Sequence, residues 1–300
     1  MAATPPPPPT ASQGPVPNPW LLGGALLGEM LVWGSSFLAV KYAVGSFPPF
    51  LLGTIRFAVA GGVLFLVSLA LGKPLPTRRQ WAGAALVGTV MLACNSTPLA
   101  IAQRRVTSGL AAIGVASIPL WTALFAGLLL RWPGWREWAA LAVGMAGVVL
   151  LNFDGQLQGN PAGAVAILIA AAAWALGTIL TQRVPLPQGP MATAAEMLCA
   201  GAVLGLGSLA LGESFPAAPA PSAYAGLAYL IVFSSLVGIT LHSFLLRFVR
   251  PVVANSFAYT NPVVAVCLGV LIAGESVSTV SLAAMAVIVA GLAMLARSRH

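Results

Sequence analysis

The chain has 300 residues, of which 59% are hydrophobic and only 7% are charged. Soluble domains carry about a quarter charged residues, so this composition excludes a water-soluble enzyme and indicates a protein whose surrounding solvent is lipid. The formal net charge of +8 does not indicate nucleic-acid binding, because the basic residues are scattered at segment ends and are not clustered among aromatic residues.

The chain opens with the sequence MAATPPPPPTASQGPVPNP. This stretch lacks the basic start of a signal peptide and is too rich in proline to form a helix. We therefore interpret residues 1–19 as a disordered tail that stays in the mature protein, and we assign it no function.

Ten apolar segments follow, each close to the roughly 20 residues that a helix needs to cross a bilayer. A spanning helix satisfies its own backbone hydrogen bonds, which lipid cannot do. The connections are short and contain proline and glycine, so none of them can hold a soluble domain. The expected spans are residues 20–43, 49–71, 79–101, 107–131, 134–152, 160–183, 190–211, 222–247, 251–273 and 278–297. The predicted fold class is an all-α membrane protein with ten transmembrane helices.

The basic residues favour one orientation of these helices. With the N-terminus in the cytoplasm, ten Lys and Arg residues fall at inner ends, against Lys41, Arg104 and Arg105 at outer ends. The ten are Lys73, Arg78, Arg79, Arg131, Arg136, Arg183, Arg247, Arg250, Arg297 and Arg299. The positive-inside rule then predicts that both termini are cytoplasmic. The partner implied by this reading is the lipid bilayer, and the sequence leaves the oligomeric state open, with a monomer compatible.

The sequence has few residue patterns that could carry out catalysis or bind a metal or cofactor. The three cysteines each lie in an apolar run without a CxxC pattern or a partner histidine, so we expect neither a disulfide framework nor a metal site. The sequence contains no paired Asp cluster, HExxH or GxSxG pattern and no GxxxxGK[ST] phosphate loop. We therefore expect no enzyme activity, no cofactor and no ATP-driven step.

The two halves of the chain resemble one another. The sequence VAGGVL at 59–64 recurs as CAGAVL at 199–204, Trp33 corresponds to Trp174, and IPLWTALFAGLLL from 118 corresponds to NPVVAVCLGVLIA from 261. Each half, residues 20–152 and 160–297, would hold five helices, an odd number, so the second half must enter the membrane from the opposite side. The prediction is two inverted five-helix repeats, an arrangement typical of alternating-access transporters with a site near the midplane.

Several stretches carry a family resemblance. VWGSSFLAVKYAV, the IRF at 55–57, IPLWTALFAGLLL and NPVVAVCLGVLIAGESVS, followed by a glycine-bearing last helix, resemble the EamA-type transporters of the drug/metabolite transporter superfamily over residues 20–297. The chain is most similar to the YddG-type amino-acid exporters of bacterial inner membranes. The resemblance implies a ten-helix exporter with a central cavity lined by helices 1, 3, 4, 6, 8 and 9. The first-half equivalent of Glu275 is about Trp132, so one repeat lacks the acidic residue of the family pattern.

Aromatic and hydroxyl side chains mark a candidate cavity wall. Trp33 and Ser36 share one helix face, as do Trp174 and Thr178, and the inverted repeat would bring both faces to the same depth. Trp121 also lies deep in its segment. Interfacial belts, lipid contact and core packing are the alternatives for these tryptophans, and we favour the cavity because a ring gives apolar area with tolerant geometry.

Two further segments contain amides and hydroxyls within apolar helices. Asn95 and Thr97 precede Pro98 in CNSTP, which predicts a locally opened helix whose spare groups face a ligand or water. Hydrogen bonding between helices is the equal alternative. Asn255 and Tyr259 share one face of the ninth segment and are further candidates for substrate binding.

Four of the ionisable residues within the apolar segments are candidates for a functional or anchoring role. Glu29 and Glu196 are candidates for proton coupling or gating, with a protonated structural role as the alternative. His242 has no Cys, Asp or Glu near it in sequence, so we expect substrate binding, pH sensing or a structural role and not metal binding. We interpret Arg56 mainly as a structural anchor to carbonyls or a helix end, with attraction of carboxylates as the alternative.

The leading hypothesis is a secondary exporter of small metabolites, and the resemblance implies aromatic and other neutral amino acids as substrates. One alternative is a proton-coupled exporter of cationic drugs that uses a membrane carboxylate such as Glu29 or Glu196. A phosphorylated-sugar or nucleotide-sugar antiporter would need convergent Lys or Arg in the cavity, which the sequence disfavours. A passive channel would differ in showing flux without saturation.

Overall fold

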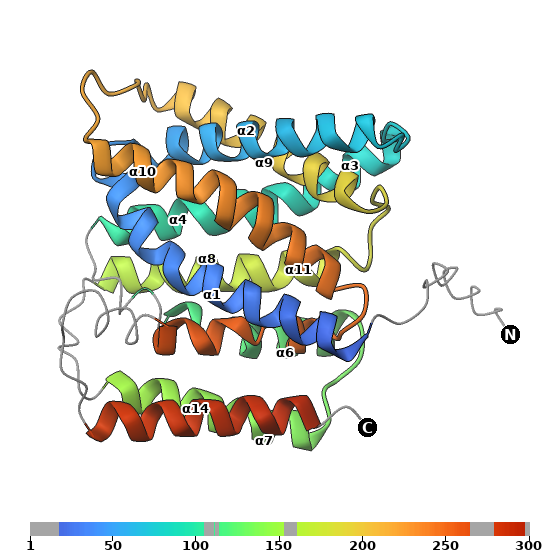
Figure 1. Cartoon of the computed structure of the whole chain (residues 1–300), viewed down its shortest axis with the longest axis vertical. Helices are drawn as coiled ribbons and strands as arrows, with labels where there is room; N and C mark the ends of the chain where they lie inside the picture. Colours follow the sequence, from blue (N-terminus) through green and yellow to red (C-terminus); the bar gives the residue numbers. More distant parts are fainter. Residues whose placement is uncertain (1–17, 105–110, 112–113, 153–160, 265–278, 298–300) are drawn as a thin grey trace, which may run out of the picture.

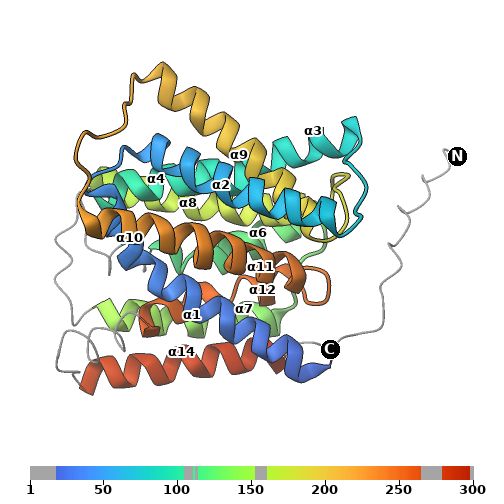
Figure 2. The same cartoon turned by 45° about the horizontal axis from the view of Figure 1, so that its top comes forward.

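The computed structural model describes residues 18–104, 111, 114–152, 161–264 and 279–297, and every regular element in these ranges is helical. The helices lie side by side along one direction in stacked layers (Figure 1). The start of α1 and the end of α14 lie at the same end of the bundle (Figures 1 and 2). We call this end the α1-start end, and the other the α1-finish end.

The first half follows the expected spans closely. Its third helix changes character along its length, since a π-helical segment separates two α-helical ones. The elements are α1 (Pro19–Val44), α2 (Pro49–Ala70), α3 (Arg78–Val87), η1 (Gly88–Ala93), α4 (Cys94–Gln103), α6 (Ile118–Leu129) and α7 (Trp135–Asn152). The expected fourth span, 107–131, is interrupted by a turn at residues 116–117.

The second half has the same succession of helices. Its elements are α8 (Pro161–Leu180), α9 (Pro190–Ala210), α10 (Pro221–Tyr229), η2 (Leu230–Ile239), α11 (Thr240–Leu245), α12 (Pro251–Ala254) and α14 (Thr279–Arg297). The expected span 251–273 is broken by a turn at residues 255–256, resumes as a helix at 257–264, and its last part lies outside the described residues.

Helix ends follow from local sequence. α1, α2, α6, α9, α10 and α12 each begin with proline in the first turn, where the missing N–H has no helical partner to lose. α2 and α9 end in matching turns, in which Gly72 and Gly212 have φ of 70° and 64°. Each turn closes with a backbone bond from the residue three beyond the helix end, from Lys73 N to Ser68 O and from Glu213 N to Ser208 O. Only glycine adopts this conformation without a steric penalty.

Five helices in the described ranges are long and apolar enough to cross a membrane. They are Pro19–Val44, Pro49–Ala70, Arg78–Gln103, Pro190–Ala210 and Pro221–Leu245. Shorter apolar helices accompany them at Ile118–Leu129, Val165–Leu180 and Leu282–Leu295. Ten spans were predicted from the sequence, and five helices of the described ranges have the length and apolar character of a span.

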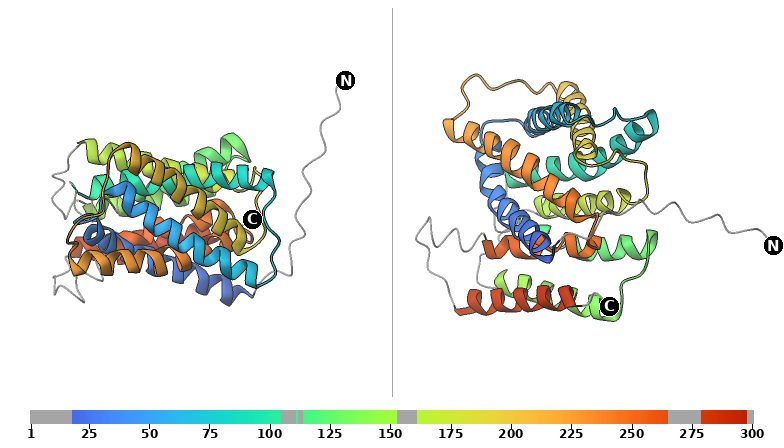
Figure 3. Two further views of the ribbon diagram at one scale, coloured as in Figure 1. Left: turned by 90° about the horizontal axis from the view of Figure 1, so that it is seen from above. Right: turned by 45° about the vertical axis from the view of Figure 1, so that its right-hand side comes forward.

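The helices pack in a crossed pattern. α2 packs on α9 at one edge of the bundle, and α7 packs on α14 at the opposite edge (Figures 1 and 3). Between these pairs, α1 packs on α10 and η2, whereas α8 packs on η1 and α4. An ion pair from Arg250 to Glu137 joins the residue before α12 to the first turn of α7. The central layers therefore mix elements from both halves of the chain.

Candidate central pocket

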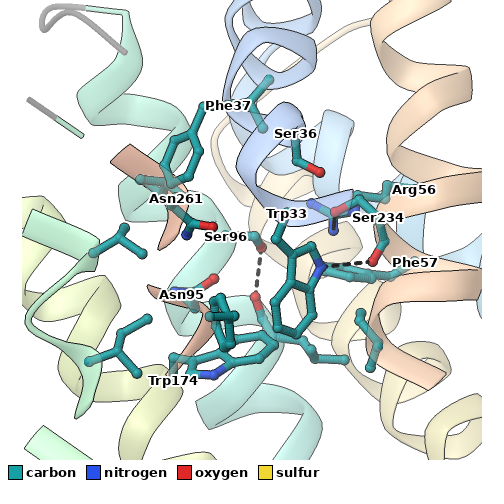
Figure 4. A pocket seen from close by; sticks show the side chains of 17 residues that line it. Trp33, Ser36, Phe37, Arg56, Phe57, Asn95, Ser96, Trp174, Ser234 and Asn261 are labelled. Atoms are coloured by element: carbon teal, nitrogen blue, oxygen red, sulfur yellow. Dashed lines mark hydrogen bonds between the residues drawn. The ribbon is translucent and has the colours of Figure 1, made fainter. Parts of the chain in front are cut away.

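A cavity lies among the central helices, with about 80 Å³ open to the centres of water molecules. Its lining comes from α1, α2, η1, α4, Val115 and the start of α6 in the first half and from α8, η2 and residues 257–264 in the second, as Figure 4 shows. The volume is sufficient for several waters. The lining on α1 runs from Trp33 to Val40, and that on α4 reaches Leu99, so the cavity extends from the level of Trp33 toward the α1-finish end.

Three aromatic rings form one end of the cavity, which we call the floor: Trp33, Trp174 and Phe257. The two indoles meet edge to face with ring centroids 4.9 Å apart, and the centroids of Trp33 and Phe257 are 4.3 Å apart. Such edge contacts suit the charge distribution of aromatic rings. Trp33 and Trp174 come from opposite halves of the chain.

Each indole N–H of the floor is hydrogen-bonded. Trp33 Nε1 donates to the carbonyl oxygen of Ser234 over 3.2 Å, and Trp174 Nε1 donates to Asn255 Oδ1 over 3.0 Å. Asn255 Nδ2 in turn donates to Thr122 Oγ1 over 2.7 Å. These bonds leave no indole donor for a substrate, so the floor presents apolar ring surface to the cavity.

A single cation lies on the described lining. Arg56 Nε donates to Ser235 Oγ over 2.7 Å, and its Nη2 donates to Ser234 Oγ over 2.9 Å. Its guanidinium carbon lies 4.8 Å from the ring centre of Phe57. These partners differ from the carbonyls or helix end that the sequence suggested, because the serine pair of η2 faces α2. Within the described ranges no carboxylate pairs with Arg56, since the ion pairs found there join His242 to Glu29 and Arg250 to Glu137.

The remaining polar groups of the lining are neutral. Asn95 Nδ2 donates to the carbonyl of Ala170 over 3.0 Å, and its Oδ1 accepts no hydrogen bond from the described residues. Ser36 and Ser96 donate to carbonyls of their own helices, those of Val32 and Leu92. Asn261 is 1% exposed, and neither its amide nitrogen nor its amide oxygen has a hydrogen-bond partner in the part of the chain that is described. The lining thus offers mainly hydrogen-bond acceptors beside one guanidinium.

Five predicted substrate-binding residues lie behind the lining. Thr178 donates to the carbonyl of Trp174, and Trp121 stacks on Phe125. Tyr259 donates to the carbonyl of Leu141, and Asn255 holds Trp174. Thr97 is buried without a hydrogen-bond partner for its hydroxyl among the described residues. Of the ten residues predicted to bind substrate, Trp33, Ser36, Asn95 and Trp174 line the cavity.

The predicted coupling residues separate into two environments. Glu29 Oε1 lies 2.7 Å from His242 Nδ1, and both side chains are fully buried. The imidazole centroid is 5.4 Å from that of Trp33 and 5.1 Å from that of Trp174, although neither Glu29 nor His242 lines the cavity. Glu196 is buried on α9 and is also absent from the lining. Glu29 and His242 are 213 positions apart in the sequence, so their pairing was not predicted.

Sequence reasoning missed several lining residues, among them Phe57, Ser234, Phe257 and Asn261. The serine pair at 234–235 in an apolar helix was an available signal, because it repeats the pattern of Ser35 and Ser36. Predictions on Cys267, Glu275, Arg105 and Arg299 fall outside the described residues. Among the residues that are described, no group of three or more His, Cys, Asp or Glu side chains gathers at one point.

Long apolar helices packed around a central, partly polar cavity define a helical membrane transport protein. The model of the EamA-like transporter family matches this chain twice, at residues 21–153 and 161–297. The chain belongs to the EamA-like transporter family, which confirms the resemblance found in the sequence.

Known proteins are similar over most of the chain. The uncharacterized inner membrane transporter YedA of Escherichia coli K12 is 39% identical over 280 residues, which are 93% of this chain and 92% of that protein. Protein PecM of Dickeya dadantii is 28% identical over 265 residues, 87% of each chain. A protein of known crystal structure shares the fold, with a TM-score of 0.73, 24% identity, and coverage of 93% of this chain and 99% of that one.

Proposed function

We propose that this protein is a secondary transporter that exports neutral amino acids, aromatic ones included, by alternating access around the central pocket. The observation that carries the proposal is the chemistry of the lining: one guanidinium without a carboxylate partner, neutral acceptors, and an aromatic floor. A neutral amino acid has a carboxylate, an ammonium and an apolar body, and each of these has a counterpart in the pocket.

The carboxylate would be bound by Arg56. Two hydroxyls hold one edge of its guanidinium, so the Nη1 hydrogens stay available for a charge-assisted hydrogen bond. The ammonium would be bound by the amide oxygens of Asn95 and Asn261. An aliphatic or aromatic side chain would lie on the rings of Trp33 and Trp174, which bury area without demanding one shape.

The alternating-access mechanism rests on the inverted repeat. Four observations support two related halves: the family model matches twice, η1 and η2 stand in the third helix of each half, and α2 and α9 end in the same glycine turn. The fourth is the crossed packing, in which the first helix of each half lies on the third helix of the other. Two halves that rock about an axis in the membrane plane would open the pocket to each side in turn.

We further propose an orientation and a location. Both termini would be cytoplasmic, because the α1-start end carries most of the Lys and Arg. The cavity then extends outward from its floor, so the structure corresponds to an outward-facing state. A bacterial inner membrane is the proposed location, as the name of the relative YedA states for that protein. The functional type that we propose is the YddG-like amino-acid exporter.

The alternatives fit the pocket less well. A cationic drug would need a carboxylate on the lining, whereas Glu29 lies beyond the floor and Glu196 is elsewhere on α9. A phosphorylated sugar or nucleotide sugar would need several convergent cations, and Arg56 is the one Lys or Arg on the described lining.

Three solutes with the same aromatic body test the proposal. Purified protein in liposomes should take up labelled phenylalanine saturably. Unlabelled phenylalanine and 3-phenylpropionate should inhibit this uptake, and phenethylamine should not. Arg56→Gln should weaken apparent affinity by about 10- to 100-fold, the equivalent of a charged hydrogen bond, with Arg56→Lys intermediate. Arg104→Gln is the control, since Arg104 donates to the carbonyls of Val44 and Phe47 away from the pocket. Saturable flux of a quaternary ammonium dye that needs Glu29 would overturn the proposal.

A further inference from the structure

A buried acid–base pair lies on the side of the floor that faces away from the cavity. Glu29 on α1 and His242 on α11 contact through Oε1 and Nδ1 at 2.7 Å, and both side chains have zero exposure. The second atoms of the two groups, Glu29 Oε2 and His242 Nε2, are buried without a hydrogen-bond partner among the described residues. Two orphaned polar atoms at one contact are unfavourable, so a purely structural role explains the pair poorly.

The pair joins the two halves of the chain at the α1-start side of the floor. Gly28 permits the close approach, because a Cβ at this position would lie 3.2 Å from Leu241 Cδ1. The imidazole touches the floor directly, with ring centroids 5.1 Å from Trp174 and 6.0 Å from Phe257. A motion that opens the pocket toward the α1-start end by parting α1 from α11 therefore breaks this contact.

No other ionisable group in the described structure pairs with Glu29 or His242. α8 and residues 257–264 present Trp174 and Phe257 to the imidazole, and α9 presents Thr193, which donates to Ser243 next along α11. The remaining ionisable residues on or next to these elements are Glu196, Cys199, Tyr259, Arg183, Arg247 and Arg250, and none of them forms an ion pair with either group. Protonation of the pair is thus governed by its own contact and its access to water.

The proton count differs between the closed and the parted pair. A buried carboxyl and imidazole are stable only when the pair has no net charge. The pair is then either a carboxylic acid with a neutral imidazole or a carboxylate with an imidazolium. Both forms hold the same number of protons. Once parted and wetted, a free carboxyl is ionised and a free imidazole is mostly neutral at about pH 7.5. Parting the two groups therefore releases about one proton to the water on the α1-start side, and closing them takes one up.

We infer that Glu29 and His242 form a proton-binding latch that keeps the α1-start side of the transporter closed when protonated and permits its opening when deprotonated. This inference rests on the proposed alternating access and names its regulation. Linkage then requires that a lower pH on the α1-start side favours the closed form. The ligand is a proton, and its source is the water of the compartment that this end of the bundle faces.

Distances between spin labels test the latch without any substrate. Labels on Trp20→Cys and Arg247→Cys, in a background with the three native cysteines replaced by serine, report the separation of α1 from the end of α11 in liposomes. Between about pH 5.5 and pH 8.5, a population with a longer distance should grow as the pH rises. The double variant Glu29→Gln/His242→Gln keeps a hydrogen-bonding pair but does not titrate, so its distances should stay constant with pH.

Glu213→Gln is the matched control, because Glu213 accepts hydrogen bonds from the backbone of Phe50 and Leu51 at the other end of the bundle. It should retain the pH dependence of the parent. Distances that do not change with pH in the parent, or that change equally in the double variant, would overturn the latch. A pH-dependent distance with no amino-acid transport would instead refute the proposed substrate and leave the latch intact.

Discussion

At the scale of residues, the pocket floor depends on Asn255 and Thr122, which do not line the cavity. Trp174 is held by Asn255, and Asn255 is held by Thr122, so three residues from three elements form one hydrogen-bonded chain. Asn255 and Thr122 are fully buried. Because each member uses its bonding capacity on the next, the loss of one leaves a buried polar group without a partner, which is costlier than the loss of an exposed bond.

Two isosteric Thr→Val substitutions distinguish the cost of leaving a buried amide without an acceptor from the cost of losing a hydroxyl alone. Thr122→Val should lower stability by about 1–3 kcal/mol, because it leaves Asn255 Nδ2 buried without an acceptor. Thr54→Val should change stability by less than about 0.5 kcal/mol, since the Thr54 hydroxyl bonds only to the carbonyl of Phe50 in its own helix. Thermal unfolding in detergent measures both, and equal losses would contradict the role of the buried chain.

At the scale of elements, glycines set the distance between helices. Gly61 on α2 faces Met197, and Gly201 on α9 faces Ala58; an added Cβ would lie 2.9 Å from Met197 Cβ and 3.0 Å from Ala58 N, both tight contacts. Gly88 begins η1 against the backbone of Glu196, whose Cα would lie 3.2 Å from an added Cβ. π-helical turns are frequent at functional sites, and here η1 directly precedes the part of the third helix that carries Asn95 and Ser96.

Alanine at two helix glycines tests this packing. Gly88→Ala should destabilise the protein by about 1–3 kcal/mol, because α9 must move away from η1 to admit the methyl group. Gly62→Ala, in open space on α2, should be neutral or stabilising by up to about 1 kcal/mol, since it adds no contact and lowers the entropy of the unfolded chain. A midpoint for Gly88→Ala at or above that of Gly62→Ala would show that the close approach is unimportant.

At the scale of the whole molecule, charge and symmetry give the bundle two different ends. The loops after α2, α6 and α8 and the residues around α11 and α12 bring their basic side chains to the α1-start end, whereas Lys41 and Arg104 lie at the other. The five helices predicted for each half are an odd number, so the second half would enter from the opposite side. The orientation and the inverted repeat are therefore linked predictions.

Reporter fusions test the orientation. A fluorescent protein fused after Arg297 should fold and fluoresce, and alkaline phosphatase at the same point should be inactive, because both report a cytoplasmic position. Fusion between α9 and α10, near residue 215, should give the opposite pair of results. Active phosphatase at the C-terminus would reverse the orientation and with it the side on which the latch opens.

The sequence predicted helix positions better than it predicted contacts. The expected spans 49–71 and 190–211 agree with Pro49–Ala70 and Pro190–Ala210, because proline starts and apolar length are local signals. The turn at 255–256 and the π-helical segments were not predicted, since they arise from packing between helices. The pairing of Glu29 with His242 and of Arg56 with two serines was not predicted either. The partners lie far apart in the sequence, and no local pattern indicates that they meet.

Counterflow tests the central claim most directly. Liposomes loaded with unlabelled phenylalanine and diluted into a trace of labelled phenylalanine should accumulate label above equilibrium and then lose it, since a carrier exchanges one solute for another through a single site. Arg56→Gln should reduce the transient strongly and Arg104→Gln should not. Label that only approaches equilibrium, at a rate linear in concentration, would contradict alternating access and indicate a channel.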